Sequence, residues 1–238
     1  MSEFKLVDPN IFTLLIGVIY GNITIPFNDK IELQLTEDNN KDGDIDLTII
    51  SQFNTDQPSY ITSHSLNVSA IDGTCPFPLF SEACEINTSP QNSVATTFSE
   101  TEDCLGPLKN TTSGYTPAPN ISNAPCFATL PLTSSLNFGG VDINFQDFQQ
   151  AARYPGDLKL DNGLFKGFIS ETEAQNIVFP AETPVIGGQS LASLLPGGLG
   201  SCSNADDRDI FTDGKTSGWW FYFNTESDII ELQESSGK

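Results

Sequence analysis

The chain has 238 residues and a formal charge of −21, because 31 acidic residues outnumber 10 lysines and arginines. Nucleic-acid binding rests on basic contacts to phosphate, so this charge argues against nucleic acid as a partner. It argues equally against an anionic membrane surface. Hydrophobic residues make up 38% of the chain and include 17 phenylalanines. This content is enough for a packed core and argues against wholesale disorder.

The first apolar stretch, Ile11 to Tyr20, is too short to cross a bilayer, which takes about 20 residues. It also lacks the basic residues that open a signal peptide. We therefore expect a buried helix or strand here and no membrane insertion. A start at Met1 without an export signal predicts a trimmed chain or one piece of a longer secreted protein.

The next stretch reads D-x-N-x-D-G-x-x-D and has the composition of a calcium loop. Calcium takes six to eight oxygen ligands, and alternate positions of a tight loop can direct oxygens to one centre. Gly43 permits the sharp turn because it lacks a Cβ. Without a cation, the aspartates of the loop repel one another. The candidate ligands are the side chains of Asp38, Asn40, Asp42 and Asp46, together with the backbone carbonyl of Asp44.

An EF-hand would need a bidentate glutamate at the twelfth position, where this chain has Ile49. Residues 31–35 and 44–49 alternate apolar and polar side chains, which predicts two strands rather than two helices around the loop. The loop resembles the calcium hairpin of FG-GAP and VCBS-type repeats, down to Leu47. That resemblance implies one Ca²⁺ site, and a single copy implies no propeller. The alternative is an Asp/Asn/Gly-rich turn without a metal.

The five cysteines form no C-x-x-C pair, and His64 is the single histidine, so zinc, iron–sulfur and haem sites have no ligand pattern. Disulfides are the better interpretation and imply an oxidising compartment. The pairs closest in sequence are Cys75–Cys84 and Cys104–Cys126, which leaves Cys202 unpaired. The odd number is equally compatible with reduced, buried thiols, and the connectivity stays open at this point.

Residues 65–71 alternate and predict a strand, whereas residues 72–125 are rich in Pro, Ser, Thr and Asn. We expect this second stretch to be an irregular, disulfide-tied insertion into a single domain spanning 1–238. It is the part of the chain where variable surface function is expected. Its alternative role is that of a solvated loop without a partner.

Regular structure is expected again from Phe127 onwards. We predict strands at 128–132, 135–138 and 141–145, a short helix at 145–152, and a hairpin in which Asn162-Gly163 joins 157–161 to 164–169. The capping box Ser170-x-x-Glu173 predicts a helix to about Val178. A second short helix is expected at 190–195.

A second acidic loop precedes Trp219–Phe223, where we expect a core strand with one aromatic edge facing outward. Its aspartates are candidates for a second cation, although their spacing is irregular: Asp206, Asp207, Asp209 and Asp213. The order of features from Asn162 to Phe223 loosely resembles uncharacterised secreted, Asp-rich bacterial lipoproteins. That resemblance carries no known activity, and this chain lacks a lipobox.

Gly188-x-Ser190 is a degraded nucleophile elbow. A serine nucleophile needs a histidine base, and His64 is the only one in the chain. We predict instead that Ser190 is a helix N-cap and that there is no serine-nucleophile activity. The tandem Trp219-Trp220 could form a sugar-stacking platform, although such residues more often fill a core.

These features together predict a mainly β, antiparallel, sandwich-like domain with two or three short helices. The first functional hypothesis is a non-enzymatic extracellular or cell-surface domain, rigidified by calcium, for adhesion, assembly or ligand binding. Its partners would be other copies, surface components or carbohydrate. The alternative is a secreted hydrolase that acts on carbohydrate through carboxylates, which would need facing acids in an aromatic-lined cleft.

Overall fold

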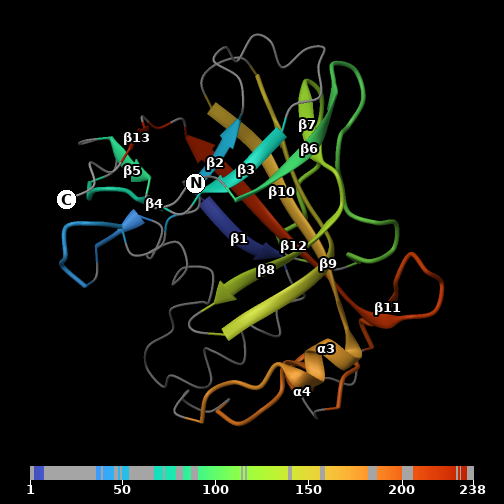
Figure 1. Cartoon of the computed structure of the whole chain (residues 1–238). Helices are drawn as coiled ribbons and strands as arrows, with labels where there is room; N and C mark the ends of the chain where they lie inside the picture. The colour runs from blue at the N-terminus through green and yellow to red at the C-terminus, as the bar shows by residue number, and fades with distance from the viewer. Residues whose placement is uncertain are drawn as a thin grey trace.

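The structure is a computed structural model of the chain (Figure 1). It describes residues 3–7, 36–38, 40–45, 48, 50–53, 67–71, 73–78, 83–86, 91–113, 115, 117–138, 141–155, 159–181, 187–199, 206–228, 230 and 232–234. The buried helix or strand predicted at 11–20 lies outside these residues, as do His64, Asp46 and Cys202.

The described part of the chain is built mainly from β-strands, with two short helices between the tenth and eleventh strands. The strands are β1 (Glu3–Val7), β2 (Ile50–Phe53), β3 (Asn67–Ile71), β4 (Gly73–Thr74), β5 (Cys84–Ile86), β6 (Gln91–Ser99), β7 (Cys126–Thr129), β8 (Leu132–Phe138), β9 (Val141–Arg153), β10 (Lys159–Ser170), β11 (Asp209–Ile210), β12 (Ser217–Asp228) and β13 (Leu232–Glu234). The helices are α3 (Glu171–Asn176) and α4 (Leu191–Leu194).

Ten strands form one open antiparallel sheet in the order β1-β12-β10-β9-β7-β6-β3-β2, with β8 beside β9 and β11 beside β12. The long strands β9, β10 and β12 run through its centre (Figure 1). A small second sheet, β13-β5-β4, lies to one side and contains a parallel pair, β13 with β5. The mainly β, antiparallel fold with two or three short helices is therefore confirmed.

Both faces of the central strands are buried, which explains why β12 has an uninterrupted aromatic run. Trp219, Phe221 and Phe223 point to one face, where they pack with residues of α3 and α4. Trp220 and Tyr222 point to the other face. Successive side chains of a strand alternate between faces, so the five aromatic residues fill two cores. Trp219 and Trp220 are each only 3% exposed. The predicted core role is confirmed, but the predicted outward aromatic edge is wrong, because both faces of the strand are buried. These two rings therefore form no sugar-stacking surface.

The helix predicted at 145–152 is wrong, because β9 continues as a strand to Arg153. The pairing with both neighbouring strands shows one extra residue in β9. The three steps from Gln146 to Gln149 lie opposite two steps of β10, and the three from Phe145 to Phe148 lie opposite two steps of β8. Asp147 has a φ of 53° at this bulge. A bulge shifts the alternation of faces by one residue, so Phe145 and Phe148 are both buried. Their spacing of three imitates a helix.

The hairpin predicted at Asn162-Gly163 is also wrong, since both residues lie inside the continuous strand β10. Pairing with β9 and β12 slips by one residue there, and Asn162 has a φ of 46°. Gly163 is required because a Cβ at this position would lie 2.1 Å from Thr225 Oγ1. Asn162 thus provides the left-handed conformation of the bulge, and Gly163 provides the close contact between strands. The same two residue types favour turns, which is why the sequence suggested a hairpin.

The helix predicted from the capping box is confirmed as α3, with Ser170 as its N-cap. The side chain of Ser170 accepts a hydrogen bond from the backbone N–H of Glu173 at 3.1 Å, and the helix ends at Asn176, before the predicted limit. Ser190 is the N-cap residue of α4, as predicted, but its side chain makes no capping hydrogen bond. Buried residues of both helices cover one face of the sheet.

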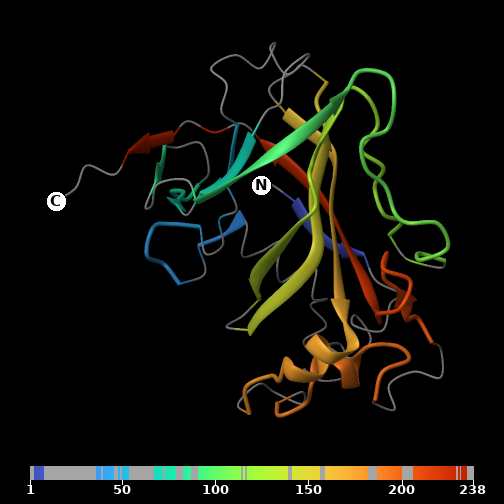
Figure 2. The same ribbon diagram turned by 45° about the vertical axis from the view of Figure 1, so that its right-hand side comes forward.

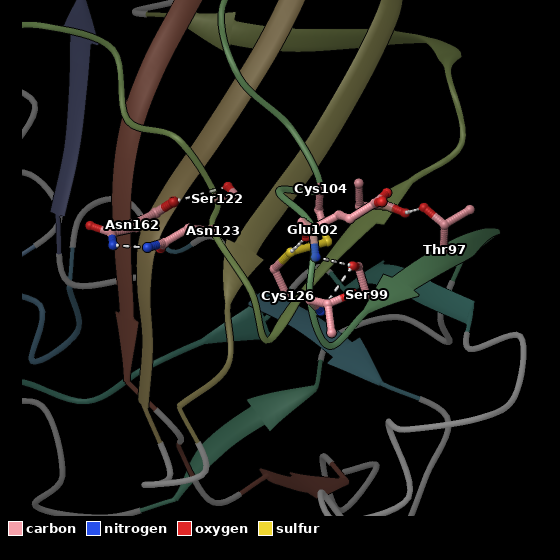
Figure 3. Close-up of a disulfide and its surroundings, with 10 residues drawn as sticks. Thr97, Ser99, Glu102, Cys104, Ser122, Asn123, Cys126 and Asn162 are labelled. Carbon is pink, nitrogen blue, oxygen red and sulfur yellow. Dashed lines mark hydrogen bonds between the residues drawn. A yellow bond between two sulfur atoms is a disulfide. The ribbon is translucent and has the colours of Figure 1, made fainter.

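The stretch 72–125 contains strands β4, β5 and β6 as well as irregular chain, so its regular part was not expected from composition. Both sequence-local disulfides are present, Cys75–Cys84 and Cys104–Cys126. Residues 101–125 run along the side of the main sheet (Figure 2). Figure 3 shows Cys104–Cys126 joining the two ends of this segment. Two disulfides indicate an oxidising environment for the folded chain.

Polar hydrogen bonds hold the segment 101–125 onto the sheet. The hydroxyl of Tyr222, on β12, lies 2.6 Å from Thr111 Oγ1 and accepts from the backbone N–H of Leu108. Ser122 is fully buried and donates to the backbone carbonyl of Asn162 at 2.9 Å (Figure 3). Since these groups are buried, losing one partner would leave the other unsatisfied.

None of the helices in the described part of the chain is long and apolar enough to span a membrane.

Candidate functional site

The candidate calcium loop folds its polar side chains inward over its own backbone. The backbone N–H of Asp42 donates to Asp38 Oδ1 at 3.1 Å and to Asn40 Oδ1 at 2.9 Å. The next two N–H groups are used in the same way: Gly43 N donates to Asp38 Oδ2, and Asp44 N donates to Asp42 Oδ1, both at 2.9 Å. Gly43 has a φ of 98°, so the turn needs the residue that the sequence supplies.

The loop is anchored to the Cys75–Cys84 disulfide. The backbone N–H of Ile45 donates to the carbonyl of Cys75, and that of Phe77 donates to the carbonyl of Gly43, both at 2.9 Å. Ile45, Cys75 and Cys84 also belong to one small apolar cluster. A short cross-linked segment therefore holds one end of an otherwise exposed loop in place.

Uncompensated negative charge gathers in this loop. Burial, followed by repulsion from Asp42, Asp38 and Glu85, raises the pKa of Asp44 above its usual range. In the described part of the chain, no carboxylate of this loop is paired with a basic side chain. A bound cation would relieve the repulsion that the sequence and the turn create.

The loop fits calcium in its donor chemistry, since carboxylate and amide oxygens are the ligands this ion prefers. Asp38, Asn40, Asp42 and Asp44 are brought into one turn, and Asp46 lies outside the described residues. Across the described residues, no three acidic, histidine or cysteine side chains have the arrangement of a metal site. Calcium at this loop therefore stays a prediction.

The second acidic loop gives its aspartates separate partners. Asp206 is paired with Arg208 at 2.6 Å, and Arg208 also reaches Glu171 of α3 at 3.0 Å. Asp213 accepts hydrogen bonds from the hydroxyl of Thr216 at 2.6 Å and from backbone N–H groups of the turn that it starts, including that of Thr216 at 2.9 Å. These contacts lower the pKa of Asp206 to about 2 and lower that of Asp213. Two of the four candidate ligands are thus already engaged.

The other two aspartates of this loop are half-buried beside the segment 101–125. The hydroxyl of Tyr115 donates a hydrogen bond to Asp207 Oδ2. Burial, then repulsion from Asp207, raises the pKa of Asp209 to about 6. Asp209 Oδ2 is buried and has no hydrogen-bond partner within the described part of the chain. Sequence spacing gave no sign of Tyr115, because 92 residues separate it from Asp207.

A pocket of about 310 Å³ lies between the start of β9 and the end of α3. Its lining includes two carboxylates, Asp142 and Glu173, neither of which the sequence suggested as a site residue. Glu173 was visible only as part of the capping box. Asp142 and Asn144 could have been placed by the alternation of β9, which leaves both exposed while Val141 and Ile143 are buried.

The serine-nucleophile prediction is untested on one side, because His64 lies outside the described residues. On the other side, Ser190 opens a four-residue helix whose Leu191, Ala192 and Leu194 are buried.

Comparison with protein family models, with curated proteins and with solved structures found no match for this chain.

Proposed function

We propose that this chain is a non-enzymatic extracellular or cell-surface domain in which calcium at the loop Asp38–Asp46 adds rigidity. It serves adhesion, assembly or ligand binding, with other copies, surface components or carbohydrate as partners. The observation that carries the proposal is the loop itself. Oxygens of Asp38, Asn40 and Asp42 are folded into one turn and hydrogen-bonded to consecutive backbone N–H groups.

The position of the loop supports a stabilising role for the ion. The loop is tied to the strand segment around Cys75 by two backbone hydrogen bonds. That segment is covalently joined to Cys84, which pairs with β13 through β5. An ion that binds only the folded loop stabilises the fold by mass action, by about 2.7 kcal/mol at 100 times its dissociation constant.

Thermal unfolding with and without calcium tests the proposal. We expect EGTA to lower the melting temperature. Asp42→Ala should abolish that sensitivity, because the Asp42 carboxylate lies at the centre of the turn and accepts a hydrogen bond from the backbone N–H of Asp44. Asp213→Ala is the matched control, since it removes the same charge from the second acidic loop. It should keep the full response to calcium.

An unchanged melting temperature in EGTA would remove calcium from the proposal. A response that is lost in Asp213→Ala and kept in Asp42→Ala would move the ion to the second loop. Direct metal analysis of the purified protein, before and after chelation, gives the number of ions bound per chain.

The alternative, a secreted hydrolase acting on carbohydrate, has less support. It would need facing acids in a cleft lined by aromatic residues. The pocket between β9 and α3 has two acids, but none of its eight described lining residues is aromatic. Trp219 and Trp220 are buried in the two cores. Hydrolysis of a panel of oligosaccharides that is lost in Asp142→Asn and Glu173→Gln would favour this alternative.

A further inference from the structure

The pocket between β9 and α3 is lined by both polar and apolar residues. Its volume of about 310 Å³ is at the small end of the range for ligand sites, roughly 300–1,000 Å³. The polar lining residues are Asp142, Asn144, Glu173 and Asn176, and the apolar ones are Val141, Ile177, Val178 and Pro180. A ligand that fills it must therefore be amphipathic.

The carboxylate of Glu173 is held in a fixed position at this pocket. Its Oε1 accepts a hydrogen bond from Asn144 Nδ2 at 2.8 Å, across from helix to strand. Its backbone is fixed on both sides, because its N–H donates to Ser170 and its carbonyl accepts from the N–H of Ile177. One carboxylate oxygen is thus engaged by Asn144, and the carboxylate keeps lone pairs for further donors.

The charge of the pocket selects the ligand. Two of the eight lining residues are acidic and none is basic. Arg208, which reaches α3 through Glu171, is also paired with Asp206. In a chain of net charge −21, such a site repels anions and attracts cations.

The apolar lining residues are suited to contact with a methylene chain. Val141 and Ile177 are buried, whereas Val178 is 53% exposed at the rim. A large exposed aliphatic side chain beside a carboxylate offers contact to an alkyl chain that ends in a charged head group. The absence of aromatic residues from the described lining makes the site less suited to a sugar ring.

We propose that this pocket binds a primary ammonium group carried on a short alkyl chain. The ammonium donates hydrogen bonds to Glu173 and to the side-chain oxygen of Asn176, with Asp142 adding attraction, and the alkyl chain lies on Ile177 and Val178. An exposed lysine of a partner protein and a free diamine both have this chemistry. The inference goes beyond the proposed function, because it needs no metal and involves a different part of the chain.

The test is an NMR titration of the ¹⁵N-labelled full chain. The probes are Nα-acetyl-lysine methylamide, cadaverine and, as the neutral control with a similar apolar chain, Nα-acetyl-norleucine methylamide. We expect both amines to shift the side-chain amide signals of Asn144 and Asn176. The norleucine compound should bind at least about tenfold more weakly, since a charged hydrogen bond is stronger than a neutral contact.

Two near-isosteric variants locate the site. Glu173→Gln should weaken binding of both amines by about threefold, and the double variant with Asp142→Asn by about tenfold, as expected for partly exposed charge pairs. The matched control is Asp103→Asn, which removes one exposed charge beside the Cys104–Cys126 disulfide. It should leave the affinity unchanged.

Tighter binding of the lysine derivative would assign the pocket to a protein side chain, and tighter binding of cadaverine to a free diamine; both support the proposal. Equal affinity for the norleucine compound would overturn it. So would unchanged affinity in the double variant, or an equal loss in Asp103→Asn, because either result would mean diffuse attraction to an acidic surface.

Discussion

The two acidic loops of the chain each contain four aspartates within nine residues or fewer, yet they are used differently. In the first loop, the side chains of Asp38 and Asp42 accept hydrogen bonds from their own turn. In the second loop, Asp206 is paired with Arg208, and Asp207 accepts a hydrogen bond from the hydroxyl of Tyr115. Acidic composition alone therefore does not identify a metal loop. What differs is whether a carboxylate is neutralised by a basic side chain, as Asp206 is by Arg208.

The largest effect is expected from removing the disulfide behind the first loop. Replacing Cys75 and Cys84 by serine opens a cross-link between residues nine apart, which we expect to cost about 2–3 kcal/mol of the free energy of unfolding. It should also reduce the calcium response, because Cys75 anchors Ile45. Urea unfolding with and without calcium measures both effects.

The matched control replaces Cys104 and Cys126, which close the segment beside the second loop. We expect a similar loss of stability, while the calcium response is retained. If the variant lacking Cys75–Cys84 kept the full response to calcium, the anchoring of the first loop through Cys75 would be wrong.

A smaller effect is expected from Tyr115→Phe, which removes one hydroxyl and leaves the half-buried carboxylate of Asp207 without that donor. Loss of one partner of a partly buried hydrogen bond costs about 1–2 kcal/mol. Urea unfolding should show this loss equally with and without calcium. A calcium-dependent loss would instead connect the second loop to the metal.

The smallest effect is expected at Asp209, and it depends on pH. Its folded-state pKa of about 6 is above the ordinary value of 3.8, so the folded protein binds this proton more tightly than the unfolded chain. The contribution of Asp209 to stability is therefore greatest below pH 4 and falls as the pH rises from 4 to 6. Asp209→Asn should remove that fall.

Because Asp209 is only partly buried, the difference should be on the order of 1 kcal/mol at pH 7, after allowance for screening. Urea unfolding of both proteins at pH 4, 5, 6 and 7 measures it, with the variant gaining relative stability as the pH rises. A constant difference between the two proteins over this range would contradict the raised pKa.

Local sequence rules predicted those parts of the fold that depend on neighbouring residues. The N-cap at Ser170 and the core strand at Trp219–Phe223 are confirmed, because each rests on contacts within a few residues or on a short run of apolar side chains. Both disulfides joined the cysteines closest in sequence. In each case the local sequence allowed few alternative structures.

The wrong predictions share one cause, which is the bulge. At Asp147 an extra residue changes the phase of the strand and produces helical spacing between Phe145 and Phe148. At Asn162-Gly163 the residues that favour a hairpin turn instead accommodate a close contact with Thr225. Both features depend on neighbouring strands, so they could not be read from a short window of sequence.

The candidate sites were predictable to different degrees for the same reason. The loop Asp38–Asp46 is continuous in sequence, so its pattern was visible. The contact between Tyr115 and Asp207 and the pocket formed by β9 and α3 combine distant segments. Such sites need the topology of the sheet before their residues can be associated.

The bulge at Asn162-Gly163 also affects how this protein ages chemically. In a free chain, the amide nitrogen of a glycine that follows asparagine attacks the asparagine side chain, and the resulting ring opens to aspartate or isoaspartate. Here Gly163 is paired opposite Thr225 in the sheet, and the Asn162 side chain donates to Asn123 Oδ1 at 3.1 Å. The folded sheet therefore restrains cyclisation, and isoaspartate at residue 162 would record how long a molecule has spent unfolded.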